Sequence, residues 1–163
     1  FLQNLKNLKK KYKIVQIHQY GLAQKNMKMD IYLPYINFFG KKLYLSTYTF
    51  PHKKELINQI NLDFIIKPNI EKNLIKVKKF ELIQSKIDLI KIDTNGSEVA
   101  IVQTLLPIIR RDKPLLIIEN NNIKKIFSFL KKIKYKKYCV KDDKLEIHLN
   151  QNNANIIFIS DQP

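Results

Sequence analysis

The chain has 163 residues, a formal net charge of +16 and an apolar share of 45%. This length favours one domain, and the apolar share excludes a wholly disordered chain. With three glycines the chain is neither collagen-like nor a Gly-rich linker, and no apolar run approaches the roughly 18–20 residues that span a bilayer. We therefore expect a folded domain without a membrane partner.

The beginning of the chain predicts one helix and one clear strand. Leucines recur every three residues over positions 2–8, which indicates the end of an amphipathic helix. A β-rich run follows at 13–17. Residues 27–33 alternate apolar and polar side chains, as expected for a half-buried strand, and Pro34 is predicted to end that strand.

Residues 35–80 have weak periodicity, and we expect an irregular excursion there. Its aromatic residues gather between 35 and 50, and short strands are predicted at 62–66 and 74–80. The aromatic stretch can pack onto a sheet edge, line an acceptor pocket or, with the nearby lysines, stack on bases.

From residue 81 to 163 the pattern is typical of an α/β fold. After a short helix at 81–85, an apolar strand at 87–92 precedes a helix at 97–111 that Pro107 should kink or shorten. A second apolar strand at 115–118 is followed by a helix from about 121 to 132. Short apolar strands that alternate with helices indicate a mostly parallel sheet, buried on both faces.

The end of the chain reads as further strands. Residues 135–140, 145–149 and 156–159 are strand-like, and Asp142-Asp143 favours a turn. Strand segments joined by short polar loops predict a C-terminal antiparallel hairpin at the edge of the sheet.

Charged residues follow both apolar strands, at the sheet edge where open α/β sheets bind ligands. They are Lys91, Asp93 and Glu98 around the first strand and Glu119 after the second. A lysine buried in an apolar strand needs a carboxylate partner, and Asp93 or Glu119 can supply it. Such a pair can transfer protons or be a purely structural ion pair. Asp93 and Glu98 can equally favour the N-terminus of the helix.

The string over 91–119 resembles the FkbM-type methyltransferases. The pattern of that family is an apolar strand with Lys-x-Asp-x-Glu-Gly-x-Glu, a helix, Lys-Pro and an apolar strand that ends in Glu. In this chain it reads Lys91-Ile92-Asp93-Thr94-Asn95-Gly96-Ser97-Glu98, then Lys113-Pro114 and 115–119. Residues 21–34 and 155–159 also fit, so the resemblance spans nearly the whole chain and is most specific at 87–119.

The resemblance implies a class I, Rossmann-like methyltransferase that uses S-adenosylmethionine. It further implies methyl transfer to a hydroxyl of a small molecule or glycan. Asp93 would position the acceptor or act as general base, and Lys91 would tune it. Glu98 and Glu119 are further catalytic candidates, and Gly21, Leu22 and Asp93 are the candidates for cofactor binding.

Two departures from the family pattern matter. Asn95 stands where the family has Glu, which leaves open a degenerate, non-catalytic interaction domain. The family's Gly-rich cofactor loop is not among Gly21, Gly40 and Gly96. We therefore expect residues 1–163 to be a partial methyltransferase domain whose N-terminal βαβ part is missing.

The basic charge supports a second hypothesis, a nucleic-acid-binding module. However, 28 of the 30 basic residues are Lys, spread along the chain with abundant Ile and Asn, which share AT-rich codons. Arg, which suits phosphate and guanine contacts, is nearly absent, so we do not expect a nucleic-acid partner. Cys139 is the only cysteine and suits a reducing, cytoplasmic setting. The three isolated histidines predict no metal site.

Overall fold

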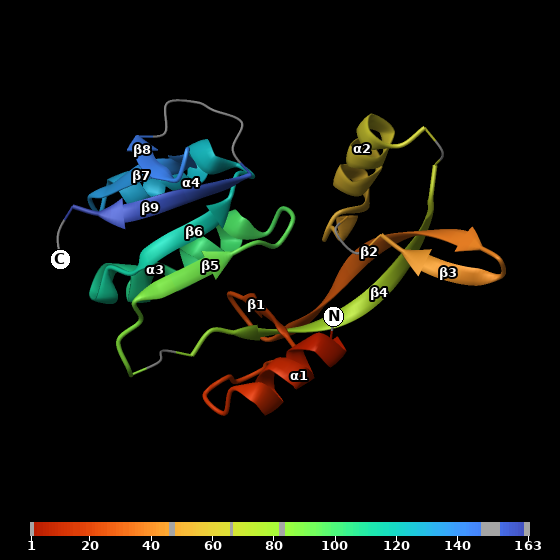
Figure 1. Ribbon diagram of the computed structural model, residues 1–163, viewed down its shortest axis with the longest axis horizontal. Helices are drawn as coiled ribbons and strands as arrows, with labels where there is room; N and C mark the ends of the chain where they lie inside the picture. The colour runs from red at the N-terminus through yellow and green to blue at the C-terminus, as the bar shows by residue number, and fades with distance from the viewer. Residues whose placement is uncertain (1, 46–47, 66, 82–83, 148–153, 162–163) are drawn as a thin grey trace.

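The computed structural model describes residues 2–45, 48–65, 67–81, 84–147 and 154–161. These residues form two sheets that lie side by side, one from each half of the chain (Figure 1). None of the described helices is both long and apolar enough to cross a membrane.

The N-terminal half forms a four-stranded sheet in the order β1-β4-β2-β3. β1 is parallel to β4, whereas β2 is antiparallel to both β3 and β4. The elements of this half are α1 (Leu2–Lys11), β1 (Gly21–Ala23), β2 (Met27–Phe38), β3 (Lys41–Tyr44), α2 (Lys53–Asp63) and β4 (Asn69–Lys79). The predicted N-terminal helix is thus present, whereas 13–17 does not form a strand.

The prediction of an irregular excursion at 35–80 is wrong. Residues 62–63, expected in a strand, belong to α2, and β4 begins well before residue 74. The prediction that Pro34 ends this strand is also wrong, since β2 continues to Phe38. The backbone of Pro34 points away from β4, and its carbonyl accepts the Leu45 N–H at 2.9 Å. The missing proline N–H therefore costs no hydrogen bond to β4.

The C-terminal half forms a five-stranded sheet in the order β5-β6-β9-β7-β8. Its elements are β5 (Leu89–Ile92), α3 (Glu98–Asp112), β6 (Leu115–Glu119), α4 (Ile123–Lys131), β7 (Tyr135–Lys141), β8 (Lys144–Ile147) and β9 (Asn155–Ser160). β5, α3 and β6 make a βαβ unit with parallel strands. The described residues 81, 84 and 85 are not helical, and 82–83 lie outside the description.

The expected mostly parallel sheet is a mixed one, with more antiparallel than parallel pairs. Only β5 and β6 are parallel in this sheet, because β9 runs back between β6 and β7 and pairs antiparallel with both. The predicted C-terminal hairpin is present as β7 and β8, and it turns at Asp142 and Asp143, which both have positive φ. Their short polar side chains tolerate that left-handed backbone.

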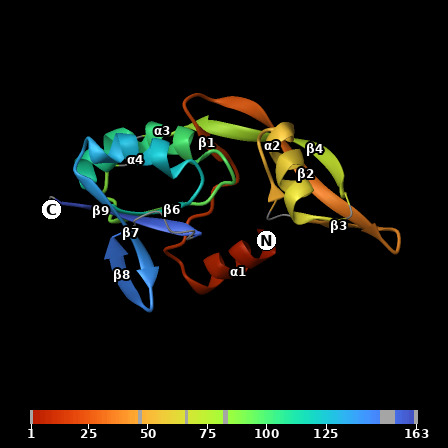
Figure 2. The same cartoon turned by 90° about the horizontal axis from the view of Figure 1, so that it is seen from above.

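The main core lies between this sheet and one layer of helices, since α3 and α4 cover the same face (Figure 2). Leu116, Ile118 and Phe158 are fully buried there. Tyr135 donates its hydroxyl to the Pro114 carbonyl at 2.8 Å, and burial raises the pKa of Tyr135 to about 12. α3 continues through Pro107 and ends at Asp112, so the proline does not shorten it.

The expectation that the apolar strands are buried on both faces is wrong for β5. Ile92 points toward the helices and is buried, whereas Leu89, on the opposite face, is 56% exposed. β5 is also the first strand of the sheet order, so no described strand pairs with its outer edge.

Candidate functional site

The ends of the parallel strands β5 and β6 bring the predicted carboxylates together. Ile92 is in register with Ile118, so the turn after β5 lies beside Glu119. The backbone N–H of Asn95 donates to Oε2 of Glu119 at 3.2 Å. Convergence at the carboxyl edge of the sheet, predicted from the sequence, is therefore present in the structure.

Lys91 and Asp93 form an ion pair, but the lysine is not buried. The Lys91 Nζ and an Asp93 Oδ are 2.9 Å apart, and the two side chains are 54% and 46% exposed. Lys91 lies on the face of β5 opposite the buried Ile92, which explains its exposure. Because both side chains are about half exposed, a ligand can reach them. An exposed ion pair of this kind adds little stability.

Glu98 is fully buried and holds the turn between β5 and α3. Its carboxylate accepts the Thr94 N–H at 3.0 Å, the Thr94 hydroxyl at 2.9 Å and the Gly96 N–H at 3.0 Å. Ser97, expected near the helix N-terminus, occupies the capping position without a side-chain cap bond. Glu98 thus satisfies backbone donors ahead of the helix, and a direct role for it in catalysis stays a prediction.

Glu119 is the carboxylate with the most altered electrostatics at this edge. Burial raises the pKa of Glu119, the Asn95 N–H bond lowers it, and the nearby carboxylates of Glu98 and Asp93 raise it again. A carboxyl group with a raised pKa keeps its proton to a higher pH than an ordinary glutamate does.

The backbone of the turn suits Asn95, which stands where the family pattern has Glu. Asn95 has a φ of 49° and Gly96 a φ of 108°, and Asn is among the few non-glycine residues that adopt such a backbone readily. A Cβ on Gly96 would lie 3.3 Å from Oε2 of Glu55. Glu55, from the first turn of α2, therefore reaches this turn from the other half of the chain, which sequence reasoning did not foresee.

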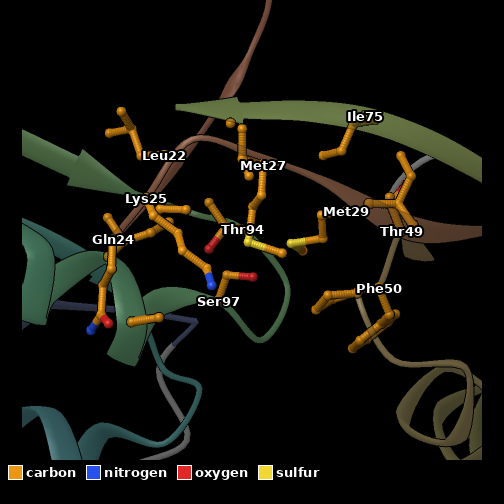
Figure 3. Close-up of a pocket in the computed structure, with 17 residues that line it drawn as sticks. Leu22, Gln24, Lys25, Met27, Met29, Thr49, Phe50, Ile75, Thr94 and Ser97 are labelled. Carbon is orange, nitrogen blue, oxygen red and sulfur yellow. The ribbon is translucent and has the colours of Figure 1, made fainter. Parts of the chain in front are cut away.

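A large cavity opens beside the turn, between the start of α3 and the four-stranded sheet of the N-terminal half, called the first sheet below (Figure 3). Its volume is about 710 Å³. It is lined by Gly21, Leu22, Ala23, Gln24, Lys25, Met27, Met29, Ile31, Thr49, Phe50, Pro51, Ile75, Val77, Thr94, Ser97, Ala100 and Ile101. Two of the three predicted cofactor residues, Gly21 and Leu22, are in this wall, whereas Asp93 is not.

Gly21 allows β1 to approach β4 closely. A Cβ at this position would lie 2.9 Å from Cγ1 of Val77, closer than real Cβ atoms come. Any side chain here would push apart two strands that form the cavity wall.

Sequence reasoning missed most of the cavity wall, although one signal was available. Met27, Met29 and Ile31 all line the cavity, and they are the first three apolar residues of the alternation at 27–33. Alternation of period two places them on one face of β2. Thr94 and Ser97 gave no comparable signal, because only the fold turns them toward the first sheet.

Among the described residues, no three His, Cys, Asp or Glu side chains are grouped so that they could hold a metal ion. The polar groups at the strand ends are the carboxyl groups of Asp93, Glu98 and Glu119, the Lys91 ammonium and the hydroxyls of Thr94 and Ser97. These groups can accept a proton, attract a cation and orient a hydroxyl-bearing ligand.

Residues 2–138, most of the chain, match the family model described as methyltransferase FkbM domain. The chain therefore belongs to the FkbM methyltransferase family, as its motif at 91–119 predicted. No curated protein and no solved structure gives a significant match.

Proposed function

We propose that this domain takes part in methyl transfer from S-adenosylmethionine to a hydroxyl of its acceptor, at the carboxyl ends of β5 and β6. The observation that carries the proposal is the cluster of Asp93, Glu98 and Glu119 beside the cavity, within the family motif. In this proposal the βαβ unit of β5, α3 and β6 belongs to a Rossmann-like sheet.

The groups at this edge fit a cofactor that carries a positive sulfonium. The carboxyl groups of Asp93, Glu98 and Glu119 outnumber the one lysine, Lys91, at this edge. A cavity of about 710 Å³ is within the range of ligand pockets, about 300–1,000 Å³. Asp93 would hold the cofactor from the β5 end, and Gly21 and Leu22 would contact its adenine end at β1, which leaves the cavity between β2, β4 and α3 for the acceptor. When bound, the cofactor supplies an electrophilic methyl group.

The residues of this chain would orient the acceptor and receive its proton. Asp93 is the first candidate, because its carboxylate is half exposed at the strand end and accepts from Lys91 at 2.9 Å. Removal of the hydroxyl proton during methyl transfer is worth about 10²–10⁴ in rate.

The test is an assay of methyl transfer by the native polypeptide that contains these residues. Labelled S-adenosylmethionine is offered with alcohols, sugars and carboxylic acids, and the product is then treated with mild base. We expect label in a base-stable ether. Label only in a base-labile ester, or no transfer to any acceptor, would contradict the proposal.

A further inference from the structure

The cavity beside the β5–α3 turn differs from a sugar-binding site in the chemistry of its walls. We infer that it binds the apolar body of an amphiphilic acceptor, such as a medium-chain alcohol or hydroxy acid, and not a glycan. Only the statement that the hydroxyl of this ligand is methylated rests on the proposed function. The binding itself can be tested separately.

The long wall of the cavity is one apolar face of the first sheet. β2 contributes Met27 and Met29, which are in register with Val77 and Ile75 of β4. The polar residues of these strands alternate onto the opposite face. Methionine side chains are flexible and polarisable, so such a wall adapts to alkyl groups of different shape.

The remaining walls close around the same apolar space. Phe50 and Pro51 come from the segment before α2, and Ala100 and Ile101 from the first turns of α3. Figure 3 shows Phe50, Met29 and Ile75 on one side of the space, Leu22 and Gln24 on the other, and Thr94 and Ser97 between them. The cavity is thus apolar along the sheet and polar beside the turn that carries the catalytic candidates.

The polar groups beside the turn suit the hydroxyl head of an amphiphile. Thr94 donates its hydroxyl hydrogen to Glu98 at 2.9 Å, so toward the cavity its Oγ1 can only accept, and a ligand hydroxyl can donate to it. Lys25 extends toward the same region (Figure 3) and is the only charged side chain among the described residues that line the cavity. An anionic or neutral head is therefore favoured over a cationic one.

A glycan does not suit these walls. Each sugar hydroxyl that loses its water contacts needs a partner, and burial without one is costly. The methionine, isoleucine and valine side chains of the sheet face offer none. An alkyl body, by contrast, gains free energy for every methylene group that it buries there.

The experiment is a fluorescence titration of the native polypeptide with dansylaminoundecanoic acid. The chain described here has no tryptophan, so the dansyl signal reports the probe directly. We expect the probe to bind, decanol and decanoic acid to displace it, and maltotriose not to do so. Lys25→Gln should weaken the binding of decanoic acid by about two- to fivefold and leave the binding of decanol unchanged.

Two variants fill or charge the cavity, and one matched control does neither. Ala100→Trp, on an exposed helix position, should weaken the probe about tenfold or more by occupying its space. Ile75→Glu should do the same, whereas Leu74→Glu, on the opposite face of β4 and 61% exposed, should not. Ala100→Trp also serves if Ile75→Glu fails to fold.

Displacement by maltotriose as effective as by decanol would overturn the inference, as would probe affinity unchanged in Ala100→Trp. Probe binding with this pattern but without methyl transfer would remove the proposed function and leave the cavity assignment standing. Methyl transfer to a sugar without probe binding would remove the cavity assignment and leave the proposed function standing.

Discussion

The five-stranded sheet of the C-terminal half, the second sheet, packs side chains tightly between its strands and the helices α3 and α4. The four-stranded first sheet instead leaves a cavity of about 710 Å³ against its apolar face. Among the described residues, all buried apolar side chains except Pro34, Leu56, Ile60, Pro68 and Val77 lie between Ile92 and Phe158. Close packing makes the second sheet sensitive to lost volume. A wall that already borders open space has fewer contacts to lose, so it can adapt to a ligand at little cost in stability.

The turn at 93–97 lies between these two regions. Glu98 ties it to the packed half through buried hydrogen bonds, and Thr94 and Ser97 present hydroxyl side chains to the open half. The difference between the halves therefore places this turn on a rigid support and beside an adaptable wall.

The largest expected effect is on the packed core. Phe158 is fully buried and stacks on Phe127, with ring centroids 6.2 Å apart. Phe158→Ala should lower the free energy of unfolding by about 3–5 kcal/mol, measured by urea denaturation. Phe39→Ala, at a 91% exposed position, is the control and should change it by about 0.5 kcal/mol or less. Equal effects would show that the second sheet is not packed as described.

The next effect concerns the support of the turn. Glu98→Ala leaves the N–H groups of Thr94 and Gly96 without their acceptor. The loss should be at least about 2 kcal/mol in the same measurement. Glu146→Ala, on the exposed strand β8, provides the comparison and should be close to neutral. A neutral Glu98→Ala would mean that other groups hold the turn.

A smaller effect is expected in the cavity wall. Met29 is half-buried and already borders open space. Met29→Ala should therefore cost about 1 kcal/mol or less, below the usual cost of a methionine deletion in a packed core. A loss as large as that of Phe158→Ala would erase the contrast between the two sheets.

The smallest effect is a pH dependence at Glu119. The folded state raises the pKa of this carboxyl above its ordinary value of 4.5, mainly through burial. The folded state therefore binds the proton more tightly than the unfolded state, and the resulting stability is lost as the pH rises through the raised pKa. The melting temperature of the wild type, relative to Glu119→Gln, should fall as the pH rises above 4.5. An opposite trend would mean that the pKa is lowered.

The parts that the sequence predicted well have strong local signals. The helix predicted at 97–111 and the strand predicted at 115–118 agree with α3 and β6 within one residue at each end. Convergence of Asp93 and Glu119 followed from the general rule that parallel strands end at one edge. Here local pattern and tertiary structure favour the same result.

The parts that it missed depend on partners distant in sequence. β9 lies between β6 and β7 although it follows both in the chain, and no local pattern indicates such an insertion. The exposure of Lys91 depends on which face of β5 the helices cover. The cavity wall pairs β2 with β4, about 40 residues later, and the aromatic residues between them concealed that pairing.

The central claim is that the β5 and β6 ends are a reaction site and not only a structural cluster. The most direct measurement is the rate of methyl transfer by Asp93→Asn in the native polypeptide, with unfolding followed on the same sample. We predict a rate about 100-fold below wild type with an unchanged unfolding midpoint. Asp88→Asn, an 85% exposed aspartate just before β5, should keep the full rate. A wild-type rate for Asp93→Asn would contradict the account.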